Sequence, residues 1–291
     1  MKNRNQINLD YLFRDQNYSN QENRPYSICR IIDGRYGHLF STFLMAGGEG
    51  RHPTVVCCHG YPGNEENMDL AHALRRVGFN VMVFHYSGSW GSGGTFSLQH
   101  CIDDAGTVID YMLSEPDYRV DEKNLFLFGQ SMGGFVVSHT LSIRKDIKAA
   151  VLAAPADFPE MWKLAQTSPK EKEAFMAGLA EGDGWLVGSD IEKVYQESRD
   201  FADGRTFSDL APKQDVPMLI IGAKYDTIVP TQKTIVPWTQ KLQKEYGDKI
   251  QYKCLETDHM FADMRCTLTE LTAEYFTDQL GSVRGTVLVA E

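Results

Sequence analysis

No stretch of the 291-residue chain approaches the roughly 20 consecutive apolar residues that a membrane-spanning helix requires. Residues 1–6 are polar, and the apolar core of a secretion signal does not follow them. Together, these absences predict a cytoplasmic protein with no segment bound in a membrane.

Clusters of lysine and arginine are also missing. The chain has 29 basic and 39 acidic residues, which gives a net charge of −10 at pH 7 with histidine neutral. Binding to nucleic acid requires basic side chains gathered against phosphates, so the sequence predicts no nucleic-acid partner. The same negative charge disfavours docking to an anionic membrane surface.

Several signatures of cofactor and metal sites do not occur. No Gly-x-Gly-x-x-Gly follows an apolar run and there is no Gly-Lys dipeptide, which disfavours dinucleotide and phosphate-loop sites. The chain also lacks His-Glu-x-x-His and Cys-x-x-Cys, two spacings typical of metal or redox sites. We therefore predict a protein that needs neither a metal nor a cofactor.

The six cysteines are predicted to be reduced. Cys57 and Cys58 are adjacent in a strand-like run, where neighbouring side chains point to opposite faces of a sheet and cannot pair comfortably. Cys29 and Cys254 fall in similar runs. Reduced thiols agree with the predicted cytoplasmic location.

Apolar runs of strand length alternate with segments of helical periodicity along most of the chain. The predicted strands cover residues 28–32, 38–44, 54–58, 79–84, 125–128, 149–154, 218–222 and 250–255. The predicted helices cover residues 67–77, 98–114, 237–246 and 264–280, and another begins at residue 135. This alternation predicts an α/β fold with a doubly wound, mostly parallel sheet of about eight strands. The first two strands are expected to form an antiparallel edge.

Two regions depart from this alternation. Residues 1–24 contain nine Asn or Gln and are predicted to form an N-terminal extension to the main domain, 25–291. Residues 155–212 hold helix-like segments, over 171–181 and 192–200, where a short connection is expected, which predicts a helical cap inserted over the strand ends. This insertion has twelve acidic and six basic residues, which form either a solvated outer face or a barrier to anionic substrates.

Ser131 lies in Gly-Gln-Ser-Met-Gly, between a predicted strand and a predicted helix. A sharp turn from strand to helix crowds the backbone, and Gly129 and Gly133 remove the side chains that would collide there. The serine hydroxyl then projects above the sheet. This pattern predicts a catalytic nucleophile.

A nucleophilic serine requires a histidine base and an acid that orients the histidine. Asp226 and His259 each follow a predicted strand, in the chain order expected for this type of elbow. Asp258 is the rival acid, although an extended backbone would point it away from the neighbouring imidazole. The predicted catalytic residues are therefore Ser131, His259 and Asp226.

The developing oxyanion also requires hydrogen-bond donors. His59-Gly60-Tyr61-Pro62-Gly63 follows a short apolar strand, and a glycine in this loop lets the backbone approach the nucleophile closely. The predicted donors are the backbone N–H groups of Tyr61 and Met132, with Gly60 allowing the approach.

At this point the chain resembles the α/β-hydrolase superfamily of serine hydrolases, and within it the group similar to serine aminopeptidases, prolyl oligopeptidases and cinnamoyl esterases. The matching motifs are His59-Gly60-Tyr61-Pro62-Gly63, Tyr86-Ser87-Gly88-Ser89-Trp90-Gly91-Ser92-Gly93-Gly94, Gly129-Gln130-Ser131-Met132-Gly133-Gly134, the stretch from Gly222 through Asp226 to Pro230, and Asp258-His259. Relatives often carry Arg-Gly where this chain has Ser87-Gly88, so any help that such an arginine gives the site is missing here.

Four further residues are candidates for substrate contacts. Glu65 follows the oxyanion loop and could hold a substrate ammonium, as acidic residues do in the aminopeptidases that the chain resembles; with Glu66 it could equally be an exposed helix start. Trp90 could line the pocket or pack within its loop. Gly60 and Trp162 complete this group.

We therefore expect a serine hydrolase that cleaves small carboxylic esters through an acyl-enzyme. An aminopeptidase, acyl-peptidase or amidase acting on short peptides is the second candidate. A third belongs to another class: a hydrolase-like protein that binds a ligand without converting it. The expected partner is a small ester or a short peptide, and the oligomeric state is left open, with a homodimer as one option.

Overall fold

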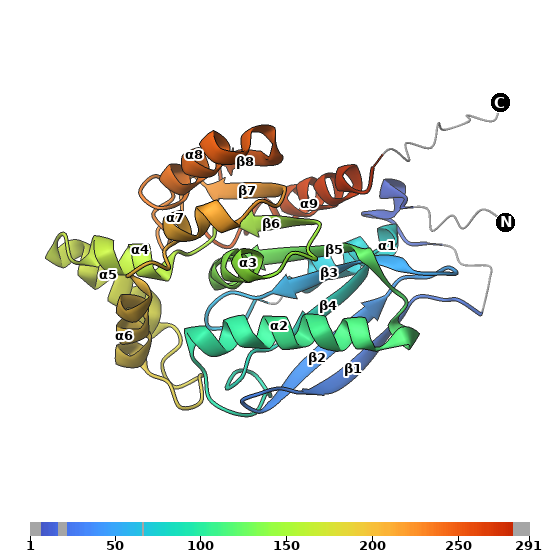
Figure 1. The fold of residues 1–291 in the computed structure, drawn as a ribbon, viewed down its shortest axis with the longest axis horizontal. Helices are drawn as coiled ribbons and strands as arrows, with labels where there is room; N and C mark the ends of the chain where they lie inside the picture. The colour runs from blue at the N-terminus through green and yellow to red at the C-terminus, as the bar shows by residue number, and fades with distance from the viewer. Residues whose placement is uncertain (1–6, 17–21, 66, 282–291) are drawn as a thin grey trace.

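Eight strands form one mixed sheet in the computed structural model, which describes residues 7–16, 22–65 and 67–281 (Figure 1). Their order across the sheet is β1-β2-β4-β3-β5-β6-β7-β8. The strands are β1 (Tyr26–Asp33), β2 (His38–Met45), β3 (His52–Cys58), β4 (Asn80–Phe84), β5 (Val120–Gln130), β6 (Ala149–Ala153), β7 (Met218–Ala223) and β8 (Ile250–Leu255).

The sheet is antiparallel at one edge and parallel elsewhere. β2 pairs antiparallel with both β1 and β4, whereas every pairing from β4 through β8 is parallel. All residues of β3, β4, β6 and β7 are buried, as expected for parallel strands covered on both faces. The predicted α/β fold with a mostly parallel sheet of about eight strands is confirmed.

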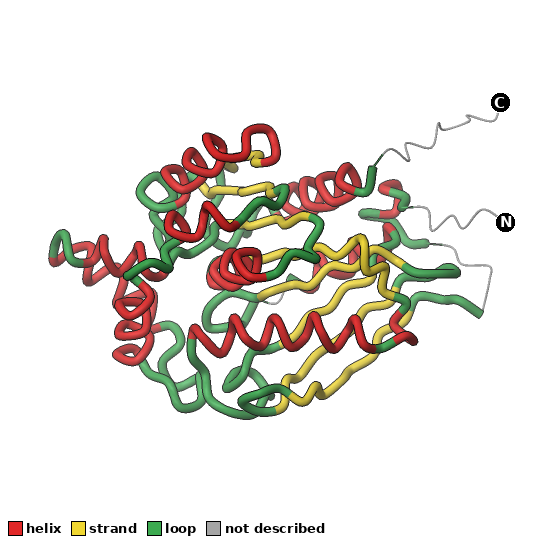
Figure 2. The backbone as a smooth tube through the Cα atoms, viewed as in Figure 1, coloured by secondary structure: helices red, strands yellow, loops and turns green. Residues whose placement is uncertain are grey.

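Helices cover both faces of this sheet (Figure 2). α2 (Leu98–Ser114), α3 (Met132–Ile143) and α8 (Ile235–Tyr246) contribute to one apolar cluster, and α1 (Met68–Val77) and α9 (Arg265–Gln279) contribute to the other. Short 3-10 helices complete the chain: η1 (Leu9–Tyr11), η2 (Pro116–Tyr118), η3 (Ala211–Lys213) and η4 (Gly247–Lys249).

The sequence explains locally where these helices start and stop. In α1, Leu70, Leu74 and Val77 recur at helical spacing and are all buried on one side. The helix ends at Gly78, whose φ of 119° suits a residue without a side chain and whose N–H bonds back into the last turn. Ser97 begins α2 by accepting a hydrogen bond from the N–H of His100.

Four helices lie between β6 and β7, and the first three of them gather beyond one end of the sheet (Figure 1). They are α4 (Phe158–Ala165), α5 (Pro169–Ala180), α6 (Ile191–Phe201) and α7 (Phe207–Leu210). The helix-like segments predicted over 171–181 and 192–200 correspond to α5 and α6. Each of the four helices follows a residue whose side chain accepts a hydrogen bond from its first turn.

Part of the predicted N-terminal extension packs against α1. Leu12 is buried in the same apolar cluster as α1, and the N–H of Asn8 donates to the carbonyl of Val77 over 3.0 Å. The Arg76 guanidinium donates to the carbonyl of Leu12. Phe13, by contrast, is exposed. Residues 1–6 and 17–21 of the extension lie outside the described part of the chain.

Two further sequence predictions concern the whole chain. All six cysteines are free, as predicted, and burial raises the pKa of Cys58 to about 12. Among the described helices, none has both the length and the apolar character needed to cross a membrane.

Asp157 joins the two ends of the helical insertion. Its carboxylate is almost fully buried and accepts a hydrogen bond from the N–H of Glu160, at the start of α4, over 3.3 Å. The other oxygen accepts from the N–H of Phe207, at the start of α7, over 2.8 Å. One side chain therefore fixes where the insertion leaves the sheet and where it returns.

We predict that Asp157→Ala destabilises the protein more than the loss of an ordinary helix cap. The variant leaves a buried N–H without an acceptor in addition to removing a cap, for an expected cost of about 2–4 kcal/mol. Asp190→Ala, which removes the cap of α6 and an exposed ion pair with Lys193, should cost about 1 kcal/mol. Urea unfolding measures both variants, and equal losses would contradict the proposed double role of Asp157.

Candidate active site

Ser131 occupies the sharp turn between β5 and α3. Its φ and ψ are 55° and −119°, a backbone geometry that side-chain-bearing residues rarely adopt. A Cβ on Gly129 would lie 2.3 Å from the carbonyl oxygen of Gly133, and a Cβ on Gly133 would lie 1.9 Å from that of Cys58. A side chain at either position would overlap a backbone carbonyl, so both positions require glycine, as expected for a nucleophile elbow.

Asp226 and His259 form a buried pair at neighbouring strand ends. Asp226 follows β7 and His259 follows β8, and these strands pair in parallel, so both loops leave from the same edge of the sheet. The Nδ1 of His259 lies 2.7 Å from Oδ2 of Asp226, whose side chain is 0% exposed. The carboxylate accepts a hydrogen bond from the Nδ1–H group. The proton of the neutral ring is then on Nδ1, and Nε2 is the nitrogen that can accept a proton.

The carboxylate of Asp226 is held on its other side as well. Its Oδ1 accepts hydrogen bonds from the N–H groups of Ile228 and Val229, over 2.9 and 2.8 Å. Both oxygens therefore have partners, and the side chain has one well-defined orientation toward the imidazole.

Asp258, the rival acid, has a different role. Its Oδ1 accepts from the N–H groups of Met260 and Ala262, over 3.1 and 3.0 Å, and so closes its own turn. Of the two acids, Asp226 is the one that contacts the imidazole of His259.

Ser131 and His259 line one cavity of about 230 Å³, and Gly60 and Tyr61 line it as well. The apolar part of its wall comes largely from the helical insertion and from the loop after β7. These side chains are Ala156, Phe158, Met161, Ala174, Phe175, Leu179, Ile228 and Val229. The cavity also contains two acidic residues, Glu65 and Glu181.

The two segments that carry the predicted oxyanion donors lie next to the serine. Met132 is the first residue of α3, where N–H groups have no partner within the helix and the helix dipole is positive. In the loop after β3, a Cβ on Gly60 would lie 3.3 Å from Cβ of Ser131, so this loop approaches the nucleophile closely.

His59 orients the peptide that carries the second donor. Its Nδ1 lies 2.7 Å from the carbonyl oxygen of Gly60, and because a carbonyl can only accept, this nitrogen donates. Burial lowers the pKa of His59 to about 3, so the ring stays neutral. The carbonyl of a trans peptide points opposite to the next N–H, so this bond also fixes the direction of the Tyr61 N–H.

The Tyr61 side chain connects the same loop to the insertion. Its hydroxyl donates to the carbonyl of Leu179 in α5 over 2.8 Å. Burial, together with the nearby Asp183 and Glu181, raises the pKa of Tyr61 above its ordinary value, so the hydroxyl keeps its proton.

The remaining predicted contact residues divide into two groups. Gly60 and Glu65 line the cavity. Glu65 accepts the N–H of Asn67 over 2.7 Å, which is a local turn contact. Glu66, its neighbour, lies outside the described residues.

Trp90 and Trp162 do not line this cavity in the described part of the chain. Trp90 stacks on Trp185 with ring centroids 5.4 Å apart, and its indole N–H donates to the carbonyl of Pro62. Trp162 packs beside Tyr195 in the insertion. Both residues belong to the packing around the site.

Two polar residues of this region were not predicted from the sequence. Gln130 lines the cavity, and Arg265 bonds to its amide. Gln130 could have been found from its place in the elbow motif, whereas nothing near Arg265 in the sequence indicates its partners. Within the described ranges, no group of His, Cys, Asp and Glu side chains is arranged to bind a metal ion.

Residues 50–181 match the family model described as serine aminopeptidase, S33. Among curated proteins, the chain is 32% identical over 111 residues to the uncharacterized protein Rv2307c of Mycobacterium tuberculosis, a match that covers 38% of each chain. It is 37% identical over 82 residues to the uncharacterized protein YfhR of Salmonella typhimurium, covering 28% of this chain and 27% of the relative. These matches span less than half the length of either relative.

Solved structures match over a larger share of the chain. The esterase PF2001 of Pyrococcus furiosus has a TM-score of 0.66 at 18% identity, covering 89% of this chain and 92% of the esterase. Est1E of Butyrivibrio proteoclasticus has a TM-score of 0.68 at 18% identity, covering 87% and 99%. Acylaminoacyl peptidase of Pyrococcus horikoshii has a TM-score of 0.65 at 14% identity, covering 88% and 42%. The sheet order, the elbow and these comparisons agree that the chain has an α/β-hydrolase fold.

Proposed function

We propose that the protein is a serine hydrolase that cleaves small carboxylic esters with an apolar acyl group. The observation that carries the proposal is the buried Asp226–His259 pair, whose imidazole lines the same cavity as Ser131. A serine on a strained elbow beside an oriented imidazole is the arrangement that acyl transfer requires.

The first half of the reaction forms an acyl-enzyme. Oγ of Ser131 attacks the ester carbonyl carbon while Nε2 of His259 takes the hydroxyl proton. Asp226 stabilises the resulting imidazolium. The ester C–O bond then breaks, and the imidazolium gives its proton to the departing alcohol.

The second half releases the acid. Water enters the cavity, Nε2 of His259 takes one of its protons, and the hydroxide oxygen attacks the acyl carbon. The bond to Oγ of Ser131 breaks, and the serine recovers its proton from the imidazolium. The protein returns to its starting state with one ester converted to an acid and an alcohol.

The backbone N–H groups of Tyr61 and Met132 are proposed to bind the oxyanion in both halves. Such donors act in a fixed orientation and require no rearrangement when charge develops, and each contributes about 3 kcal/mol to transition-state stabilisation. His59 supports this role, because its bond to the Gly60 carbonyl holds the peptide that carries one donor.

We propose that residues 155–212 act as a cap over the site. Phe158, Met161, Phe175 and Leu179 of the insertion face the cavity and supply much of its apolar wall. This lining favours an apolar acyl group or alcohol, since burial of apolar surface drives binding. Glu65 and Glu181 disfavour a second carboxylate on the substrate.

A peptidase is the second candidate, and two observations favour it. The matching family model is that of a serine aminopeptidase, and acidic side chains in the cavity could hold a substrate ammonium. A protein that only binds a ligand is less consistent with the site, because ligand binding alone does not require an aspartate to orient a histidine beside a strained serine.

Replacing the nucleophile should abolish the reaction. We predict that Ser131→Ala lowers kcat for p-nitrophenyl butyrate hydrolysis by about a millionfold, the scale found when a triad serine is removed. A fluorophosphonate probe should label the wild-type protein and not this variant. Ser142→Ala, which removes another hydroxyl from α3, is the matched control and should behave as wild type. Labelling of Ser131→Ala, or its retention of activity, would refute the proposal.

The two neighbouring acids should differ sharply in effect. In Asp226→Asn the amide oxygen is expected to keep the bonds from Ile228 and Val229, which turns the NH₂ group toward His259 and places the imidazole proton on Nε2. That tautomer cannot accept the serine proton, so kcat should fall by about 10⁴-fold.

Asp258→Asn is the control for this variant, because the amide oxygen can still accept the two N–H groups of the turn. Its kcat should stay within about twofold of wild type. Steady-state kinetics of both variants decide the point, and similar losses would show that Asp226 is not the orienting acid.

Substrate charge should matter because the cavity holds Glu65 and Glu181. We predict that kcat/KM is at least about tenfold higher for p-nitrophenyl butyrate than for the monoanionic p-nitrophenyl succinate, through like-charge repulsion of roughly 1.4 kcal/mol. Glu181→Gln should narrow this ratio. Equal rates for the two esters would argue against the assignment, and faster hydrolysis of a matched p-nitroanilide would favour the peptidase.

A further inference from the structure

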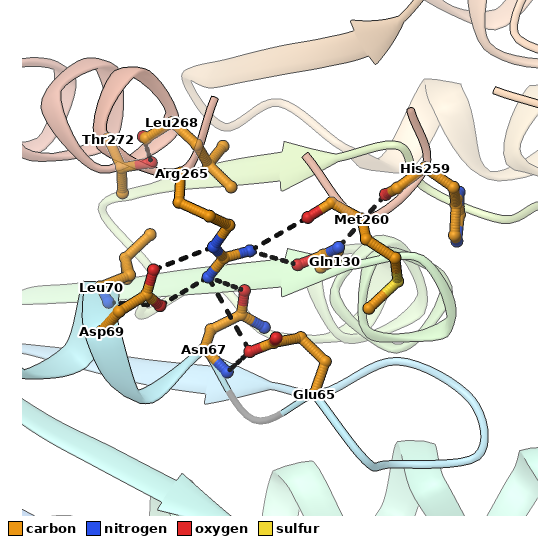
Figure 3. A network of polar contacts seen from close by, with 10 residues as sticks. All are labelled: Glu65, Asn67, Asp69, Leu70, Gln130, His259, Met260, Arg265, Leu268 and Thr272. Atoms are coloured by element: carbon orange, nitrogen blue, oxygen red, sulfur yellow. Dashed lines mark hydrogen bonds and ion pairs between the residues drawn. The ribbon is translucent and has the colours of Figure 1, made fainter. Parts of the chain in front are cut away.

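Arg265 contacts α1 and three segments that line the cavity: the loop after β3, the nucleophile elbow at Ser131, and the loop after β8 that carries His259, called the histidine loop (Figure 3). It is the first residue of α9, and its side chain is 19% exposed. The guanidinium binds the carboxylate of Asp69 in α1 through two hydrogen bonds, from Nε over 2.9 Å and from Nη2 over 2.6 Å. This two-point contact fixes the plane of the guanidinium and the direction of its remaining N–H groups.

The second contact reaches the nucleophile elbow and the histidine loop. Nη1 of Arg265 donates to Oε1 of Gln130 over 3.3 Å and approaches the carbonyl oxygen of Met260 at 3.4 Å. The other end of the Gln130 amide donates to the carbonyl of His259 over 3.3 Å (Figure 3). Gln130 precedes Ser131 directly, so one amide and one guanidinium connect the serine with the histidine.

The third contact reaches the loop that follows β3. Nη2 of Arg265 donates to Oδ1 of Asn67 over 3.0 Å, and Oε1 of Glu65 lies 3.9 Å from the same nitrogen. Asn67 is buried, and its φ of 57° is a left-handed backbone conformation that few residues with a side chain adopt. The same loop carries Gly60 and Tyr61, so this contact joins Arg265 to the segment of the predicted oxyanion donor.

Stability of α9 alone does not explain an arginine at this position. A cation in the first turn of a helix faces the positive end of the helix dipole, where an acidic residue is favoured. Burial also opposes the charge of Arg265, although Asp69 and Glu65 more than compensate and the pKa of the guanidinium is raised. The contacts outside α9 therefore account for the residue.

We propose that Arg265 is a positioning residue that holds the histidine loop and the loop after β3 against the Ser131 elbow. It does not contact the substrate. It acts through Gln130 and Met260 on His259, and through Asn67 on the segment that carries Tyr61. The role rests on the proposed serine-hydrolase function, in which Ser131, His259 and the Tyr61 N–H must meet at one acyl carbon.

Small displacements of these groups are costly for catalysis. A reacting group that moves by about 1 Å from its productive position can lose about a hundredfold in rate. The loss should appear in kcat rather than in KM, because the apolar walls that bind the acyl group belong to other segments. This division between kcat and KM separates positioning from a general loss of stability.

The test compares Arg265→Met with Arg144→Met in the full-length protein. Arg144 is a matched control because its side chain is 18% exposed, it pairs with Asp110 and Asp146, and it does not line the cavity. Both variants should lower the melting temperature. Arg265→Met should also lower kcat for p-nitrophenyl butyrate by about 30- to 100-fold with KM within about twofold, while Arg144→Met leaves kcat within about twofold.

Arg265→Lys provides a second test in case Arg265→Met does not fold. A lysine keeps the charge beside Asp69, but one ammonium cannot reach Asp69, Gln130 and Met260 together, so kcat should fall by about tenfold. Labelling by the fluorophosphonate should slow in parallel. Wild-type kcat in Arg265→Lys, or equal kcat in the two methionine variants, would overturn the positioning role.

The same assays separate this role from the function on which it depends. If the wild-type protein is not labelled at Ser131, the serine-hydrolase function itself is wrong. If the wild type is labelled and the Arg265 variants react at the same rate, the hydrolase function stands and Arg265 has no positioning role. In a double variant, Arg265→Met with Gln130→Met, the loss in kcat should be smaller than the product of the two single losses, because both changes break one chain of contacts.

Discussion

The hydrogen bond between Asp226 and His259 is the interaction on which the rest of the site depends. It sets the tautomer of the imidazole and leaves Nε2 as the nitrogen that, in the proposed reaction, takes a proton from Ser131. The bond persists because the Asp226 side chain is buried and its second oxygen is occupied by two N–H groups of its own loop. Without it, Ser131 would be a strained serine beside an imidazole of undefined orientation.

The sheet explains how such distant residues meet. β3, β5, β7 and β8 run in the same direction, so the loops that hold Gly60, Ser131, Asp226 and His259 all leave from one edge. Open α/β sheets bind ligands at this edge. Residues of the helical insertion line the cavity at this edge, Asp157 bonds to both ends of the insertion, and Tyr61 bonds to Leu179 within it. A few polar contacts therefore join the segments around the site to one another.

Short-range patterns made much of this architecture predictable. Buried apolar runs, glycines at a crowded turn and the chain order of Ser131, Asp226 and His259 are all visible in the sequence. The helices α4 and α7 were not predicted, because eight and four residues are too few for a clear helical period. The stacking of Trp90 on Trp185 and the contacts of Arg265 with Asp69 and Gln130 join residues far apart in the chain. Such pairs follow from the tertiary fold and leave no local signal.

The most direct test of the central claim is a crystal structure of the protein after reaction with a fluorophosphonate. The phosphorus should be bonded to Oγ of Ser131, with one phosphonyl oxygen about 3 Å from the backbone nitrogens of Tyr61 and Met132, and with His259 still bonded to Asp226. An adduct on another residue, or a phosphonyl oxygen directed away from both N–H groups, would contradict the account.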